Sequence, residues 1–117
     1  MAKLADPFYN NAVKNYREDI DKCDGHLLDF LQSRVMFAAA FAKTKHRLGI
    51  PIEDTKREAQ VKKNAVTFIK KHGCGLITTD DISEYIDIVI KITKRAEERQ
   101  IAELEKDNES SRTAQTH

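Results

Sequence analysis

Residues that interrupt helices are scarce in this chain. Its 117 residues include only two prolines and four glycines. Apart from Gly25, these residues stand at three places, which are Pro7, residues 49–51 and residues 73–75. The long stretches between them contain no proline, and no alternation of polar and apolar residues long enough to indicate a β-strand. The sequence therefore predicts an all-α fold.

A charge of one sign, paired cysteines and long apolar runs are also missing. Lysine and arginine number 20 against 19 acidic residues, and the net charge of +1 gives no general attraction to nucleic acid or acidic membranes. Cys23 and Cys74 are in no metal-ligand spacing, and we expect both to be reduced in a cytoplasmic protein. Residues 1–19 lack the apolar core of a secretory signal, and the longest apolar run, residues 35–42, is too short to span a bilayer. We therefore expect no nucleic-acid or membrane partner.

The breaks divide the chain into helical segments. The first segment covers about residues 7–48, and its apolar residues recur at spacings of three, four and seven. Gly49 can take a left-handed conformation at its end, and Pro51 prevents the helix from continuing. The second segment covers about residues 55–72, with Asp54 as its N-cap.

A third helix is predicted after the glycines at residues 73–75. Polar residues at 78–81 can cap it, and Asp81 with Glu84 resembles a capping box. Its apolar stripe predicts a helix to about Lys106. Residues 107–117 are polar and without periodicity, and we expect a disordered tail there. The folded domain would then be residues 1–106.

The predicted helices differ greatly in length. The first, of about 40 residues, would be about 60 Å long. Two helices of about 18 and 27 residues cannot cover its apolar stripe in a compact monomer. The mismatch predicts a homodimer whose long helices pair across a two-fold axis.

Two cations share a face of the first helix. Arg34 and Lys45 are eleven residues apart, which returns the helix to within about 20° of the same direction. The small Ala38 lies between them, so the face offers a gap with two positive groups, which suits a small anion. The alternative is that both cations simply pack their stems on apolar neighbours and extend into solvent.

Two further pairs have helical spacing. Asp54 and Glu58 are four residues apart at the start of the second helix, with Arg57 between them. Thr93 and Glu97 have the same spacing on the third helix. These residues could form a polar site, but helix capping, compensation of the helix dipole and a hydroxyl bonded to the preceding turn would also account for them.

A longer pattern connects these residues. It runs without a gap from Arg17 through Arg34 and Lys45 to Glu58, and continues more weakly to Glu97. The residues that carry it are Arg17, Asp24, Leu27, Leu28, Leu31, Arg34, Lys45, Gly49, Ile50, Pro51, Asp54, Arg57, Glu58, Gly75, Leu76, Thr93 and Glu97. This pattern closely resembles the helical chorismate mutase family, the type II class, over about 80 of the 117 residues.

The resemblance implies a fold, an assembly and a reaction. Three helices per chain would form an intertwined six-helix homodimer. The enzyme would be an isomerase that converts chorismate to prephenate in phenylalanine and tyrosine biosynthesis, with no cofactor and no metal. Arg17 and Lys45 are 28 residues apart, about 42 Å along one helix, so they can meet only if two copies run antiparallel.

The resemblance also implies residue roles at the two carboxylates of the substrate. Arg17 of the partner subunit would bind one carboxylate, and Arg34 would bind a carboxylate from its own subunit. Arg57 would add positive charge beside them. Thr93, where the family often has serine, would assist a carboxylate.

The other implied roles concern the reacting atoms and the ring. Lys45 would contact a carboxylate and the ether oxygen, and Glu97 would face the ether oxygen. Asp54, through its backbone, and Glu58, through its carboxylate, would hold the ring hydroxyl. Lys45, Glu97 and Arg34 would then be the catalytic residues.

Two alternatives remain at this point. One is the related lyase that removes pyruvate from isochorismate on the same scaffold; Asp54 and Glu58 favour the mutase, because together they suit the ring hydroxyl of chorismate. The other is a non-catalytic helical dimer, either a partner-binding module or a degenerate mutase. The four histidines are scattered, and we expect none of them to be catalytic.

Overall fold

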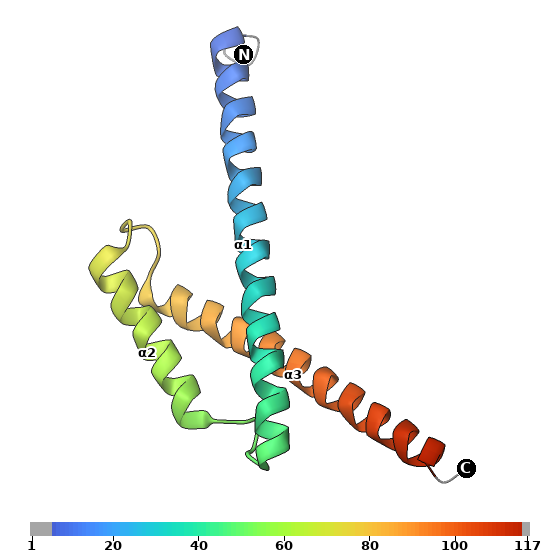
Figure 1. The fold of residues 1–117 in the computed structure, drawn as a ribbon. Coiled ribbons are helices and arrows are strands. Elements are labelled where there is room, and N and C mark those ends of the chain that lie inside the picture. The colour runs from blue at the N-terminus through green and yellow to red at the C-terminus, as the bar shows by residue number, and fades with distance from the viewer. Residues whose placement is uncertain (1–5, 116–117) are drawn as a thin grey trace. The chain divides into compact units, whose positions relative to one another are not determined.

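Three α-helices form the chain. The computed structural model describes residues 6–115, and within that range it contains no strand. The helices are α1 (Pro7–Leu48), α2 (Thr55–His72) and α3 (Thr79–Gln115) (Figure 1). The chain divides into two compact units, Met1–Ser33 and Arg34–His117, and α1 contributes to both. The all-α prediction is confirmed.

The end of α1 is fixed by a glycine. Gly49 has a φ of 68°, in the left-handed region that glycine adopts most easily. Its N–H donates to the carbonyl of His46 at 3.2 Å, and the N–H of Ile50 donates to the carbonyl of Lys45 at 2.9 Å. This pair of bonds is a Schellman motif, and it satisfies carbonyls that the last turn would leave free. The predicted role of Gly49 is confirmed.

Local contacts also define both ends of α2. Asp54 precedes the helix with an extended backbone, and its Oδ1 accepts a hydrogen bond from the N–H of Arg57 at 3.0 Å, as an N-cap does. At the other end, the N–H of Gly73 donates to the carbonyl of Ile69 at 2.9 Å. A Cβ at position 73 would clash with that carbonyl oxygen, so only glycine fits there.

The start of α3 differs from the prediction in its capping residues. The N–H of Thr78 donates to Oδ2 of Asp81, and the N–H of Asp81 donates to Oγ1 of Thr78, both at 3.0 Å. This reciprocal pair is the capping box, and the predicted pair of Asp81 with Glu84 is wrong. The reason is that Thr78, directly before the helix, is the N-cap, which places Asp81 at the third helical position.

The far end of α3 also differs from the prediction. The helix continues to Gln115, through residues 107–115, where the sequence predicted a disordered tail. No proline or glycine follows Gly75, so nothing in the backbone chemistry stops the helix near Lys106. Residues 116–117 of the predicted tail lie outside the described residues.

The unit Arg34–His117 has a thin core. Within it, α2 packs against α3 (Figure 1). Among the described residues, the buried apolar side chains are those of Ala42 and Val89, and Thr93 is a buried polar residue. The other apolar residues on the three helices are half-buried or exposed. So small a core leaves much apolar surface that could be covered by another chain.

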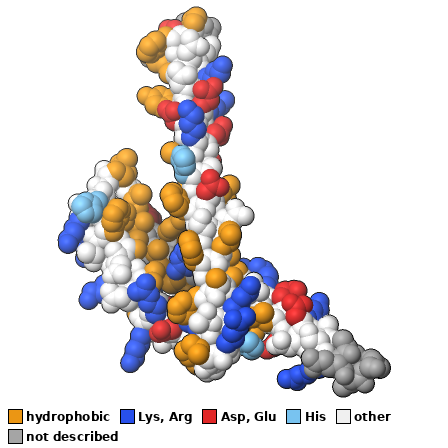
Figure 2. All heavy atoms as spheres, viewed as in Figure 1, with side chains coloured by type: hydrophobic (Ala, Val, Ile, Leu, Met, Phe, Trp, Pro, Cys, Tyr) orange, Lys and Arg blue, Asp and Glu red, His pale blue; other side chains and the backbone are white. Residues whose placement is uncertain are grey.

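The described part of the unit Met1–Ser33 is Asp6 followed by residues 7–33 of α1. A single helix has no core of its own, and its large apolar side chains are exposed, including Tyr16 (69%), Ile20 (59%) and Leu27 (57%). Apolar side chains are visible at the surface along this helix in Figure 2. In residues 6–115, no helix is long and apolar enough to cross a membrane.

Candidate active site

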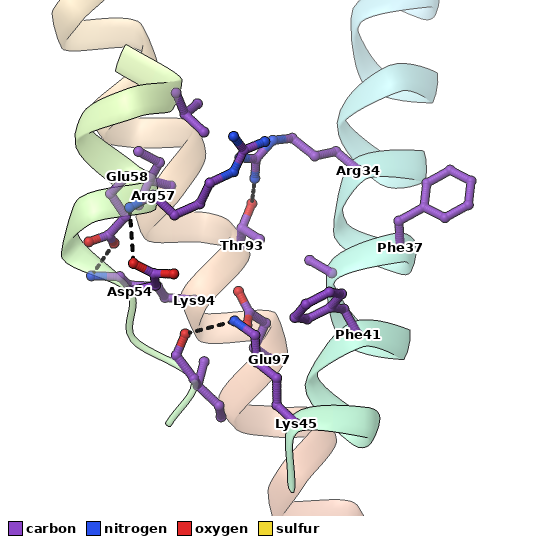
Figure 3. A pocket seen from close by; sticks show the side chains of 14 residues that line it. Arg34, Phe37, Phe41, Lys45, Asp54, Arg57, Glu58, Thr93, Lys94 and Glu97 are labelled. Atoms are coloured by element: carbon purple, nitrogen blue, oxygen red, sulfur yellow. Dashed lines mark hydrogen bonds and ion pairs between the residues drawn. The ribbon is translucent and has the colours of Figure 1, made fainter. Parts of the chain in front are cut away.

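A cavity of about 510 Å³ lies in the unit Arg34–His117 (Figure 3). This volume falls in the range of roughly 300–1,000 Å³ that is typical of small-molecule sites. All three helices line it. The lining residues are Arg34, Phe37, Ala38, Phe41, Lys45, Ile52, Asp54, Arg57, Glu58, Val61, Ile90, Thr93, Lys94 and Glu97.

Helical periodicity explains why these residues meet. On α3, the lining residues after Ile90 lie three, four and seven positions further along, which places all four on one face of the helix. They are Ile90, Thr93, Lys94 and Glu97. The lining residues of α1 and those at the start of α2 have the same spacings. Each helix therefore presents one stripe to the cavity, and the stripes differ in charge.

Arg34 is held by a side chain of another helix. Its Nη1 donates to Oγ1 of Thr93 at 2.5 Å (Figure 3). The Thr93 hydroxyl in turn donates to the carbonyl of Val89 at 2.8 Å. The single hydroxyl hydrogen of Thr93 is thus used within α3, while its oxygen orients the guanidinium of Arg34. Within residues 6–115, neither Arg34 nor Arg57 has an acidic partner, so both guanidinium groups are available to a bound anion.

Lys45 connects α1 to the loop that precedes α2. Its Nζ donates to the carbonyl of Ile52 at 3.2 Å and lies 4.6 Å from the centre of the Phe41 ring. The first contact is a hydrogen bond and the second is a cation–π interaction. The ammonium group is held at the cavity wall with donors left for a ligand.

Lys94 is paired with two acidic side chains. Its Nζ lies 2.5 Å from Oε1 of Glu58 and 3.0 Å from Oε1 of Glu53. The contact with Glu58 is the main cause that raises the pKa of Lys94, and the contact with Glu53 adds to the rise. Oε1 of Glu58 is buried and, although it belongs to this ion pair, it accepts no hydrogen bond of normal geometry within the described residues. The Glu58 side chain as a whole is 24% exposed and lines the cavity, so its carboxylate can accept a hydrogen bond from a ligand.

Glu97 lies half-buried at the same cavity. Burial raises the pKa of its carboxyl, while the positive charges of Lys45, Arg34 and Lys94 act in the opposite direction and Glu58 adds to the rise. Figure 3 shows both Glu97 and Lys45 at the cavity. A carboxyl group of this kind is more readily protonated than a free glutamate, and in that form it can donate a hydrogen bond.

The structure brings together most of the residues that the sequence singled out. Seven of them line the cavity: Arg34, Lys45, Asp54, Arg57, Glu58, Thr93 and Glu97. Arg17 is exposed on α1 and belongs to the unit Met1–Ser33, so its role stays a prediction. Ala38 also lines the cavity, between Arg34 and Lys45, as the helical spacing predicted.

Lys94 is a cavity residue that the sequence interpretation missed. It directly follows Thr93 and precedes Glu97 by three, so it belongs to the same helical stripe. That spacing could have identified it. Its acidic partners could not be recognised in the same way, because Glu53 and Glu58 belong to another part of the chain.

The charges of the cavity suit a small anion with a polar, uncharged end. Four cationic and three acidic side chains line it. Arg34, Arg57 and Lys45 supply positive groups, and Glu58 supplies an acceptor beside Lys94. Among residues 6–115, no group of three or more His, Cys, Asp or Glu side chains is placed to hold a metal ion.

Comparison with known proteins identifies the family. Residues 16–98 match the model of the family described as chorismate mutase type II. A 4-amino-4-deoxychorismate mutase of Streptomyces venezuelae is 32% identical over 63 residues, which are 54% of this chain and 61% of that protein. The match thus spans less than two thirds of that relative, and no solved structure matches the chain. Because the family match covers most of the chain, including Arg17 and every residue that lines the cavity, this protein belongs to the chorismate mutase type II family.

Proposed function

We propose that this protein is a chorismate mutase, which rearranges chorismate to prephenate without a cofactor. The observation that carries the proposal is the cavity itself. Among residues 6–115, the guanidinium groups of Arg34 and Arg57 have no acidic partner, and they share the cavity with Lys45 and with the carboxylate of Glu58. Chorismate has two carboxylates and a ring hydroxyl, and this set of groups matches it in charge and in hydrogen bonding.

The reaction demands orientation more than proton transfer. One C–O bond breaks while one C–C bond forms within a single molecule, and no nucleophile is needed. The substrate must be held in a compact, chair-like conformation with its reacting carbons close together. Arg34 and Arg57, with Arg17 of the partner subunit, would hold the two carboxylates in that conformation, which removes much of the entropic barrier.

Charge stabilisation would supply the rest of the rate. Partial negative charge develops on the ether oxygen as its bond to carbon stretches. Lys45 and a protonated Glu97 would both donate hydrogen bonds to that oxygen. Because the charge exists only as the bond breaks, these contacts stabilise the transition state more than the bound substrate.

We infer that Thr93 assists a carboxylate indirectly, through Arg34. Its hydroxyl hydrogen bonds to the carbonyl of Val89, so it is not free to donate to a carboxylate. Its oxygen instead accepts from Arg34. We therefore assign Thr93 to the positioning of Arg34.

Two copies of the chain would complete the site. Arg17 lies on a part of α1 whose large apolar side chains are exposed, and a second copy could cover them. In an antiparallel arrangement, the same pairing would carry Arg17 of the partner subunit to the cavity. An intertwined six-helix homodimer is therefore part of the proposal.

The ring substituent of the substrate defines a second candidate. The relative from Streptomyces venezuelae is named for a compound with an amino group at position 4 in place of the hydroxyl. The carboxylate of Glu58 could accept a hydrogen bond from either substituent. Chorismate is the first choice, because the charge of Glu58 is already paired with Lys94.

The direct test is conversion of chorismate by purified protein, with and without Arg34→Ala. The wild type should consume chorismate and yield prephenate, identified by NMR. Arg34→Ala should lower kcat/KM by at least about 100-fold, because a charged contact to the reacting substrate is lost. Circular dichroism should show unchanged helicity.

A matched control removes another guanidinium from the same helix. Arg47 stands in the last turn of α1, is exposed and does not line the cavity. Arg47→Ala should keep kcat/KM within about twofold of the wild type, as expected for a surface change. Absence of turnover by the wild type, or near-normal turnover by Arg34→Ala, would contradict the proposal. Release of pyruvate from isochorismate would favour the lyase instead.

A further inference from the structure

Lys94 is a cation placed at the end of the cavity where acidic groups gather. It extends from α3 to Glu58 in the first turn of α2 and to Glu53 just before that helix. We propose that Lys94 is a specificity-determining residue, which neutralises Glu58 so that the cavity accepts a ring hydroxyl and disfavours a ring ammonium group. This inference rests on the proposed function, and it concerns the substrate class of the same site.

Of the two ion pairs that Lys94 makes, the one with Glu58 is less exposed to solvent. The side chain of Glu58 is 24% exposed and that of Lys94 is 34% exposed, whereas that of Glu53 is 67% exposed. Charges interact more strongly where water is partly excluded, so Lys94 acts on the cavity mainly through Glu58. Glu53 lies largely in solvent, where its charge is screened.

The geometry of the pair leaves Glu58 able to bind substrate. Oε1 of Glu58 is buried 2.5 Å from Nζ of Lys94, while the Glu58 side chain as a whole is partly exposed and lines the cavity. A carboxylate oxygen can accept more than one hydrogen bond. A substrate hydroxyl could therefore donate to Glu58 while the charge of that carboxylate stays balanced by Lys94.

The two ring substituents differ in charge. A hydroxyl group is neutral and needs only an acceptor. An alkyl amino group is largely protonated near pH 7 and needs net negative charge around it. With Lys94 in place, a substrate ammonium beside Glu58 would also lie near the lysine ammonium. Such like-charge repulsion is a general way to reject a competing ligand.

A purely structural role for Lys94 makes a different prediction. Lys94 also joins α3 to the start of α2, so its loss could disturb the cavity as a whole. Disturbance of this kind would lower the turnover of both substrates together. If Lys94 determines specificity, its loss instead changes kcat/KM for the two substrates in opposite directions, because only one of them carries a charge on the ring substituent.

The experiment compares chorismate with 4-amino-4-deoxychorismate as substrates of the full chain. Lys94→Met keeps the length of the apolar stem and removes the charge. The ratio of kcat/KM for chorismate to that for the amino compound should fall at least about tenfold, as expected when one nearby unit charge is lost. The kcat/KM for the amino compound should itself rise. Lys94→Gln, measured in parallel, should show the same direction.

Two further variants serve as controls. Lys94→Arg retains the charge and should restore a ratio within about threefold of the wild type, since it can still pair with Glu58. Lys91→Met removes a lysine from an exposed position of the same helix, outside the main cavity, and should leave the ratio unchanged. It controls for the loss of one positive charge on α3.

The outcomes separate this inference from the proposed function. An unchanged ratio in folded Lys94→Met and Lys94→Gln, or an equal loss with both substrates, would overturn the role of Lys94, while turnover of chorismate by the wild type would still support the proposed function. Failure of the wild type to convert either compound would overturn the proposed function and this inference with it.

Discussion

The charged side chains of the cavity are held in place by groups from other elements. Arg34 on α1 donates to Thr93 on α3, and Lys45 on α1 donates to the carbonyl of Ile52 in the following loop. These contacts reduce the freedom of long side chains before any ligand binds. Preorganised charges of this kind cost little reorganisation during a reaction, which makes them effective in stabilising a transition state.

Glu97 leads to a prediction about pH. Burial raises the pKa of its carboxyl, and an ionised carboxylate can only accept hydrogen bonds. If the protonated form donates to the ether oxygen, kcat/KM should be highest below the raised pKa and should fall as the pH rises through it. A pH profile of kcat/KM for chorismate measures this directly.

Two variants make the pH test specific. Glu97→Gln keeps a donor at every pH, so its profile should be flat in the window where wild-type activity falls. Glu98→Gln changes an exposed neighbour that does not line the cavity, and it should keep the wild-type profile. A fall with pH in Glu97→Gln that matches the wild type would contradict a donor role for Glu97.

At the scale of single residues, the sequence predicted which residues line the cavity better than it predicted their contacts. Arg34, Lys45 and Glu97 could be selected because helical spacing places them on defined faces. The pairing of Lys94 with Glu58 could not be predicted, because it depends on how α3 meets the start of α2. The same reason explains Thr93, whose hydrogen bonds place it beside Arg34 rather than free to bind a carboxylate.

At the scale of the helices, local chemistry decides most boundaries. α1 ends at a left-handed glycine, and α2 begins at an aspartate N-cap, and both signals are legible in a few neighbouring residues. The C-terminal end of α3 has no such signal. A polar composition predicted a disordered tail after Lys106, but polarity alone does not stop a helix that lacks proline and glycine.

Asp54 allows the contribution of a helix cap to be measured. Its Oδ1 accepts from the N–H of Arg57 at 3.0 Å, and the side chain is exposed. Asp54→Ala should lower the free energy of unfolding by about 1 kcal/mol, because that N–H loses its partner. Asp54→Asn can cap equally well and should change stability by no more than a few tenths of that amount. Chemical denaturation followed by circular dichroism measures both.

The same two variants test how Asp54 contacts the substrate. If its contribution at the ring hydroxyl comes through the backbone, Asp54→Asn should retain chorismate turnover as well as stability. Equal destabilisation by alanine and asparagine would contradict the capping role. A strong loss of turnover in a stable Asp54→Asn would show that the carboxylate itself is needed.

At the scale of the whole molecule, apolar surface is the dominant feature. Ala42 and Val89 are the buried apolar residues of the described chain, while large side chains such as Ile20, Leu27 and Phe30 are more than half exposed. Exposed apolar surface on this scale is typical of chains that assemble. A homodimer would cover it, and the dimer would also supply the third arginine of the proposed site.

The sequence and the structure of a single chain therefore describe different parts of the proposed site. The residues that line the cavity all belong to the unit Arg34–His117 and have helical spacing. The family match covers these residues and also Arg17. In the proposed homodimer, Arg17 of the partner subunit would reach the cavity. The central claim is that each site draws on two subunits.

Subunit mixing tests that claim most directly. Arg17→Ala and Arg34→Ala should each be nearly inactive alone, because each removes one arginine from both sites of a dimer. After exchange of subunits, a mixed dimer has one site with both arginines intact. Random pairing of equal amounts should then restore about a quarter of wild-type activity, as expected for a two-fold dimer.

A second mixture provides the control for this measurement. Arg34→Ala and Lys45→Ala affect the same half of the site, so a dimer of the two has no intact site and should show no recovery. Recovery to about a quarter in the first mixture and none in the second is the predicted result. No recovery in the first mixture, after subunit exchange has been verified by mass spectrometry of tagged chains, would contradict a site shared between two subunits.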